Sequence, residues 1–276
     1  MNATFGWGFL CGPGAADGWT ALLPLLVPTG LLLCYVCAAA RNPGSWPDVR
    51  TASFALGCLL IALALTPAAL DWAAADMRGH MAQHLLLGMF APLALVMGRP
   101  GTLFLRTVST RTARRTVRLL ATGIVRALIH PLVAMLMSAG TLYVVYLTPL
   151  GAMLAQNAWW HAWLLAHFVV AGSVFAWSIA GPDPAPHRPG HRVRLVALFL
   201  AGAAHTGLAT YLGAFPVDLG PNDVEAAGWM LYGGDVAEGL LAWALFHSWR
   251  TAGRRPTRAA VRASAVAAMR RARSSA

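Results

Sequence analysis

A segment that combines histidine, methionine and a nearby carboxylate, MRGHMAQH, offers the side chains of a metal site. Four of its residues follow i, i+3, i+4, i+7 spacing and form one stripe on an α-helix: Met77, His80, Met81 and His84. Imidazole and thioether ligands together suit copper, and thioether favours Cu(I). Asp76, four residues before His80, is placed to orient its ring. The segment therefore predicts part of a copper site.

Further ionisable side chains occur inside other hydrophobic runs, where they are costly and are functional candidates by default. At 1.5 Å per residue, His167 and His205 lie about 12 Å from one membrane surface, and Asp235 and Glu238 lie about 10 and 15 Å from it. On a straight helix His161 is about 240° from His167, so we expect His161 at the mouth of the site. The predicted metal ligands are His80, His84, His167, His205, Met77, Met81, Asp235, Glu238 and His161.

Other interpretations of the same side chains stay open. A single intramembrane histidine is most often a structural hydrogen-bonding group, and two facing histidines could instead be axial ligands of a haem. Imidazole with carboxylate also suits zinc or Cu(II). Cys34, Cys37 and Cys58 could form a separate Cu(I) site of a copper transporter, although buried cysteine usually acts as a small apolar residue.

The elements that must position these residues are membrane helices. The 276-residue chain is 58 % hydrophobic and 11 % charged, with a mean hydropathy of +0.58, whereas soluble domains carry roughly 25 % charged residues. A span needs roughly 20 apolar residues, and lipid leaves no partner for an unpaired backbone amide. We therefore predict an all-α, polytopic membrane bundle of seven helices over residues 19–40, 51–70, 78–97, 130–148, 159–181, 193–213 and 228–249. Prolines in or beside these runs predict kinks.

The distribution of arginine supports seven spans. The net charge is +11, every basic residue is arginine, and all except Arg78 fall in alternate inter-helix segments or in the carboxyl-terminal tail. Because positive residues gather on the cytoplasmic side, this pattern predicts an outside amino terminus and a cytoplasmic tail, and it argues against nucleic acid as a partner. The expected domains are an external segment 1–18, a transmembrane domain 19–249 and a basic tail 250–276. Residues 106–126 and 257–273 carry arginine at near-helical spacing, as amphipathic helices on anionic lipid do.

Several of these segments resemble a known family. HMAQHLLLGMFAPLALVMGRP (80–100), HFVVAGSVFAWSIAGPDPAP (167–186), RLVALFLAGAAHTGLATYLG (194–213) and YGGDVAEGLLAWALFHSW (232–249) look like segments of the CtaG-like cytochrome c oxidase assembly factors, a family of seven-span membrane proteins. The resemblance covers about residues 20–250.

The resemblance implies a role in building a haem–copper oxidase, with support for copper delivery. It implies cytochrome c oxidase subunits as partners, a copper chaperone as a possible donor, and a bacterial inner-membrane location. His80, His84, His167, His205 and the Asp235/Glu238 pair match the positions of the family's motifs. No bond-making catalysis is implied, so we expect a protein that is not an enzyme.

Overall fold

The structure is a computed structural model that describes residues 22–253, apart from residues 23, 43, 156, 186–187 and 216–221. All the regular secondary structure in this part of the chain is helical. The elements are α1 (Leu26–Ala40), α2 (Asp48–Ala64), α3 (Pro67–Ala75), α4 (Met77–Leu85), the π-helix η3 (Leu86–Phe90), α5 (Ala91–Met97), α6 (Pro100–Thr107), α7 (Thr110–Leu120), α8 (Gly123–Leu128), α9 (Pro131–Leu147), α10 (Pro149–Ala155), α11 (Ala158–Ala180), α12 (His191–Ala214) and α13 (Asp223–Gly253). The all-α prediction is confirmed.

The described part of each predicted hydrophobic run is largely helical, but the run 51–70 is divided between α2 and α3, and the helices differ in length and hydropathy. Met77–Met97, Trp159–Ala180 and His191–Ala214 are each long and apolar enough to cross a membrane. α2 and α3 together make a fourth candidate, bent by 56°. α1 and α9 are apolar but have only 15 and 17 residues, and α13 interrupts its apolar stretch with two carboxylates. The part of the chain that the structure describes thus has three or four candidate crossings by length and composition, and seven crossings stay a prediction.

The bend between α2 and α3 has a local cause and a specific partner. Pro67 has no backbone N–H, and it begins α3 with Thr66 as the N-cap, whose hydroxyl accepts from the N–H of Ala69. The break removes the helical partner of the Ala64 carbonyl. The Gln83 side-chain amide donates to that carbonyl over 2.9 Å, from α4. A glutamine within the predicted metal motif therefore serves the fold.

The π-helical turn η3 follows from Pro92. An α-helix would pair the Gly88 carbonyl with the N–H of residue 92, which proline lacks. That carbonyl instead lies against Gly172 of α11, so closely that a Cβ atom at position 172 would overlap it. The continuous span Met77–Met97 thus has a π-helical turn in its middle, and the backbone at this turn packs directly against α11.

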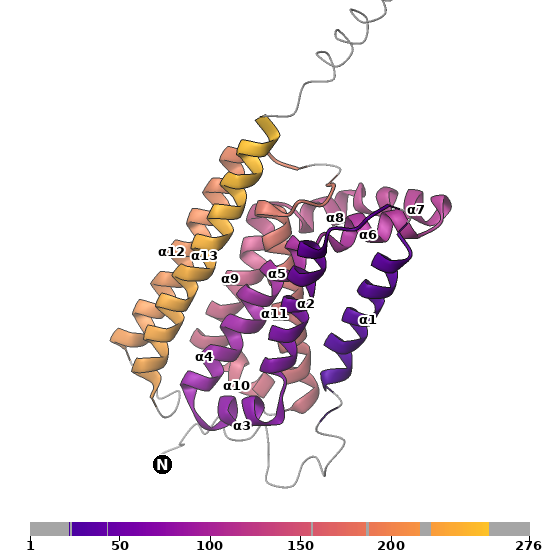
Figure 1. The fold of residues 1–276 in the computed structure, drawn as a ribbon. Coiled ribbons are helices and arrows are strands. Elements are labelled where there is room, and N and C mark those ends of the chain that lie inside the picture. Colours follow the sequence, from indigo (N-terminus) through magenta and orange to yellow (C-terminus); the bar gives the residue numbers. More distant parts are fainter. Residues whose placement is uncertain are drawn as a thin grey trace, which may run out of the picture.

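The helices pack as a bundle with one long pair at its side (Figure 1). α12 and α13 run side by side, α4, α5, α9 and α11 occupy the middle, and α6 to α8 lie across one end. Among the described residues, the core divides into three buried clusters. One is centred on Met81 and Tyr146, one on Ile179 and Leu245, and one on Tyr35 and Leu87.

Polar side chains join the elements at the end where α6 to α8 lie. The Asp183 carboxylate accepts from the backbone N–H groups of Gly101 (2.9 Å) and Thr102 (2.8 Å), in the first turn of α6. Arg194 donates to the carbonyl of Ile179 over 2.9 Å, and Arg188 donates to the carbonyls of Gly181 and Asp183. Helix termini that would otherwise have unpaired backbone groups are satisfied in this way.

The opposite end carries a smaller ionic network. Arg78 pairs with Asp76 (2.7 Å) and with Glu225 (3.2 Å) of α13, and Asn222 donates to Asp76 over 2.8 Å. Asp76, predicted to orient His80, instead caps α4 by accepting from the N–H of Arg78. Its hydrogen bonds with Arg78 lower the pKa of Asp76 to about 2.

Some predictions concern residues outside the described range. The external segment 1–18 and the amphipathic helix over 257–273 fall there, as does almost all of the basic tail. The amphipathic prediction for 106–126 falls on α6, α7 and α8, which are helical. The sidedness of the termini and the domain boundaries remain predictions.

Candidate metal site

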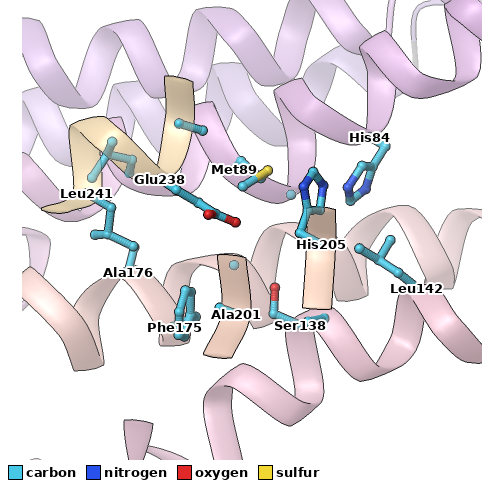
Figure 2. Close-up of a pocket in the computed structure, with 15 residues that line it drawn as sticks. His84, Met89, Ser138, Leu142, Phe175, Ala176, Ala201, His205, Glu238 and Leu241 are labelled. Atoms are coloured by element: carbon cyan, nitrogen blue, oxygen red, sulfur yellow. The ribbon is translucent and has the colours of Figure 1, made fainter. Parts of the chain in front are cut away.

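A small cavity lies between the central helices and the α12–α13 pair (Figure 2). Its volume is about 50 Å³, which is room for an ion or a few water molecules. Most of its lining is apolar. Five lining residues have a nitrogen, oxygen or sulfur atom in the side chain, and each comes from a different element: His84, Met89, Ser138, His205 and Glu238. Two predicted histidine ligands and one predicted carboxylate are therefore brought to one place.

The two imidazoles in this cavity lack the partners that buried polar groups normally have. His84 and His205 are 6 % and 4 % exposed, and their ring centroids are 6.0 Å apart. Neither ring nitrogen of His84 has a hydrogen-bond partner, and neither does Nε2 of His205. An unpaired buried polar group costs about 1–3 kcal/mol. Three such nitrogens therefore lie together at one cavity.

Glycines make room for the polar side chains. A Cβ atom at position 234 of α13 would overlap the His205 ring, and one at position 202 of α12 would overlap the Glu238 carboxylate. These two glycines face each other's helix, so each helix accommodates the polar side chain of the other. The close α12–α13 packing is thus matched to the placement of His205 and Glu238.

The two carboxylates that were predicted as a pair point in different directions from α13. Glu238 is half-buried and lines the cavity, with its carboxylate directed into it (Figure 2). Asp235, three residues earlier, is exposed and does not line the cavity. Spacing of i, i+3 turns a helix by about 300°, which leaves about 60° between the two side chains. That angle is enough to place only one of them inside.

The methionine at the cavity differs from the two that were predicted. Met77 and Met81 are 4 % and 1 % exposed and belong to the core cluster, where Met81 Sδ accepts from the Tyr146 hydroxyl over 3.7 Å. Met89 lines the cavity with His84 instead. Met89 lies within η3, which begins two residues after His84, and the wider π-helical turn changes the direction of the side chains that follow His84. Pro92 was the sequence signal for this turn, whereas straight-helix spacing favoured Met81. Nothing in the sequence pointed to Ser138 on α9.

His80 and His161 line a second, larger cavity. It is apolar, has a volume of about 580 Å³, and lies among α1, α2, α3, α4 and α11. Gln83 also lines it, and the His80 ring meets the ring of Tyr146 edge-on at 5.9 Å. The stripe predicted on α4 is therefore divided, with His80 facing this cavity and His84 facing the smaller one.

His167 is held by α9 and lines neither cavity. Its Nε2 lies 2.9 Å from the Thr141 hydroxyl and 3.2 Å from the carbonyl of Met137, and its ring stacks on Trp163. Because the Thr141 hydroxyl donates to the Met137 carbonyl, Nε2 of His167 carries the proton and donates. The structure gives His167 the hydrogen-bonding role that the sequence left open for an intramembrane histidine.

The remaining thiols are scattered. Cys34 and Cys37 are exposed on α1, and Cys58 is buried in the core against α5. Across the residues that the structure describes, no three histidine, cysteine, aspartate or glutamate side chains meet in a geometry that could hold a metal ion. His84, His205 and Glu238 share a cavity without converging on one point.

Fold and site together define an all-helical membrane protein that buries unpaired imidazoles beside a carboxylate. The model of the cytochrome c oxidase caa3 assembly factor family (Caa3_CtaG) matches residues 30–252. The chain therefore belongs to this family, as its sequence motifs predicted.

Comparison with curated proteins finds relatives in mycobacteria. An uncharacterized protein of Mycobacterium leprae is 31 % identical over 172 residues, and an uncharacterized protein of Mycobacterium bovis is 32 % identical over 175 residues. The aligned parts cover 60 % and 61 % of this chain but only 26 % of either relative. The chain thus spans about a quarter of these larger proteins. No solved structure matches it.

Proposed function

We propose that this protein supports the assembly of a haem–copper cytochrome c oxidase in the bacterial cell membrane by holding copper as cargo in the cavity between His84 and His205. Membership of the family gives the assembly role. The observation that carries the copper proposal is the pair of buried imidazoles with three unpaired nitrogens. Bound copper would accept one lone pair from each neutral imidazole ring.

The donor set suits Cu(I). Imidazole and thioether are ligands of this ion, and Met89 supplies the thioether. Glu238 supplies negative charge that offsets the charge of the cargo. The side chains must turn toward a common point on loading, because they share the cavity without converging. Such a site gives up its ion more easily than a rigid one, as delivery requires.

His80 and His161 would receive the ion first. They lie nearer to the carboxylate-rich end of the bundle, and His80 precedes His84 by one helical turn. We place this end outside, with seven crossings and a cytoplasmic tail. An oxidase subunit would take the copper there, and a copper chaperone is the proposed donor. The role requires no bond-making catalysis.

Copper content tests the proposal directly. Detergent-purified protein exposed to Cu(I) under reducing conditions should retain stoichiometric metal, and His84→Ala and His205→Ala should each lose most of it. His167→Gln is the matched control, because His167 is hydrogen-bonded to α9 and does not line the cavity. Oxidase activity in cells should fall with the first two substitutions while the protein stays in the membrane. Full copper retention by both alanine variants would contradict the proposal.

Haem binding is the second candidate function, and the larger cavity favours it. A volume of about 580 Å³ is in the range of small-molecule sites, and His80 and His161 both line it. The smaller cavity, at about 50 Å³, has no room for a porphyrin. A Soret absorption band in purified protein, lost in His80→Ala, would establish this function, and a spectrum without the band would remove it.

A further inference from the structure

An open cationic pocket lies at the arginine-rich end of the bundle, away from both histidine cavities. Its volume is about 580 Å³, and its lining is Gly123, Arg126, Ala127, His130, Val133, Arg188 and Pro189. Two elements far apart in sequence thus contribute one arginine each. α8 supplies Arg126 and the loop before α12 supplies Arg188. Such a convergence of positive charge suits an anion.

The cations of this pocket are held in place to different degrees. Arg188 donates to the carbonyls of Gly181 and Asp183, which fixes its guanidinium at the pocket wall. His130 begins α9 as its N-cap, so the positive end of a 17-residue helix also faces this region. Arg126 is exposed and free to close on a ligand.

Among the described residues, the carboxylate of Asp183 is near enough to act on Arg188, so it offsets part of the charge of the pocket. Residues 98–130 contain no aspartate or glutamate. Asp183, on the neighbouring loop, is committed to the first turn of α6.

The helix beside the pocket extends the positive surface. Arg111, Arg114, Arg115 and Arg118 follow i, i+3, i+4, i+7 spacing on α7, and all four are exposed. α6, α7 and α8 lie across the end of the bundle rather than along it (Figure 1). Helices in this orientation can rest on a bilayer surface with their cations among the headgroups.

Apolar side chains accompany the arginines. Ile124 and Leu128 on α8 are 78 % and 44 % exposed, and Leu119 on α7 is 60 % exposed. A soluble anion gains nothing from such neighbours. A phospholipid presents a phosphate and acyl chains together, and this surface offers a partner to each.

We propose that the pocket formed by Arg126, His130 and Arg188 binds the phosphate headgroup of an anionic phospholipid, with the α7 arginines on the surrounding headgroups. The bound lipid links α8, α9 and the loop before α12. It would anchor the end of the bundle that lies opposite the histidine-lined sites. This inference is independent of the copper proposal, because it uses none of the same residues.

Lipid retention measured by native mass spectrometry tests the inference. The full chain, purified in mild detergent, is mixed with phosphatidylglycerol or with phosphatidylcholine, and bound lipids are counted. We expect retained phosphatidylglycerol and little phosphatidylcholine. Arg126→Gln should weaken phosphatidylglycerol binding by about fivefold, the effect of one cation at a membrane surface. Arg188 is left intact because it also satisfies backbone carbonyls.

The matched control is Arg192→Gln, an exposed arginine at the same end that does not line the pocket. Its lipid retention should equal that of the unsubstituted protein. Equal losses in Arg126→Gln and Arg192→Gln would overturn the inference in favour of non-specific attraction. Displacement of the lipid by millimolar inorganic phosphate would also overturn it, since the site would then be one for a soluble anion. Unchanged lipid binding with lost oxidase co-purification would assign the surface to a protein partner instead.

Discussion

At the scale of single residues, histidines that look alike in the sequence have different surroundings in the structure. His167 is satisfied by Thr141 and the Met137 carbonyl, whereas His84 has no partner for either ring nitrogen. Burial alone therefore does not mark a ligand. The distinguishing property is an unpaired nitrogen that faces a cavity, and among the predicted ligands His84 and His205 have it.

Gly234 makes room for the His205 ring, so a substitution at Gly234 tests the site without replacing any of the proposed ligands. Gly234→Ala adds a methyl group that must displace the buried imidazole, so we expect a large loss of bound copper. Gly239→Ala is the control on the same helix, because a Cβ atom there meets nothing within 4 Å. Copper per chain in the two purified variants is the measurement. Equal copper content in the two variants would show that the position of His205 does not matter for copper binding.

Asp76 gives a second residue-level prediction, on pH. Its pKa is about 2 in the folded protein because Arg78 holds the ionised form, and an unperturbed aspartate has a pKa near 3.9. A depressed folded-state pKa contributes stability that is complete above the unfolded value and disappears as pH falls toward the folded one. The difference in melting temperature between the protein and Asp76→Asn should stay constant from pH 8 to 5 and shrink below about pH 4. A difference that changes between pH 8 and 5 would point to another group.

At the scale of elements, breaks in helices place side chains that an unbroken helix would misplace. Met89 in the turn η3 lines the same cavity as His84. At the bend after α2, the side-chain amide of Gln83 donates to the Ala64 carbonyl. The approximate positions of the helices followed from hydropathy, although the run 51–70 became the two helices α2 and α3. The breaks at Pro67 and Pro92 were predicted as kinks, but which side chains they redirect depends on packing against other helices. That is why Met77 and Met81 were assigned as ligands and Met89 was not.

Close packing at η3 makes a stability prediction. Gly172→Ala places a methyl group against the Gly88 carbonyl, which is backbone and cannot turn aside. Overpacking of this kind costs about 1–3 kcal/mol, so the melting temperature in detergent should fall by several degrees. Gly140→Ala on α9 meets only a Leu136 side chain at 3.7 Å and should leave the melting temperature unchanged or raise it. A drop in the control as large as in Gly172→Ala would show that the η3 contact is not special.

At the scale of the whole molecule, charge is polarised along the bundle. One end has the arginine-bearing helices α6 to α8 and the Arg188 and Arg194 caps, and the other has the Asp76–Arg78–Glu225 network. This polarity could be predicted from sequence because it depends on loop composition alone. Which histidines converge could not, since the depth of a residue in the membrane does not tell which neighbour its side chain faces. His161 and His167 lie on the same helix but meet different partners.

The alternating arginines predict seven crossings, which requires α1, α9 and α13 to cross in addition to the three or four candidate spans. α9 and α13 can be tested directly. α9 has 17 residues and spans about 25 Å, so a bilayer core of about 30 Å must thin or the helix must end at its edge. α13 is long enough, but Asp235 and Glu238 interrupt its apolar stretch. If both helices cross, residues on either side of each must lie on opposite faces of the membrane, as the alternating arginines require.

Cysteine labelling in intact cells measures this arrangement. In a background with the four native cysteines replaced, Met153→Cys and Val224→Cys should react with a membrane-impermeant maleimide added outside. Arg115→Cys and Arg250→Cys should react only after the cells are opened. Each pair brackets one helix, Arg115 and Met153 for α9, and Val224 and Arg250 for α13. Arg192→Cys and Phe215→Cys bracket α12, which is long and apolar enough to cross, and serve as the control pair. Labelling of both members of the α9 or α13 pair from the same side would reduce the number of crossings and remove the basis for placing the histidine cavities near the outer surface.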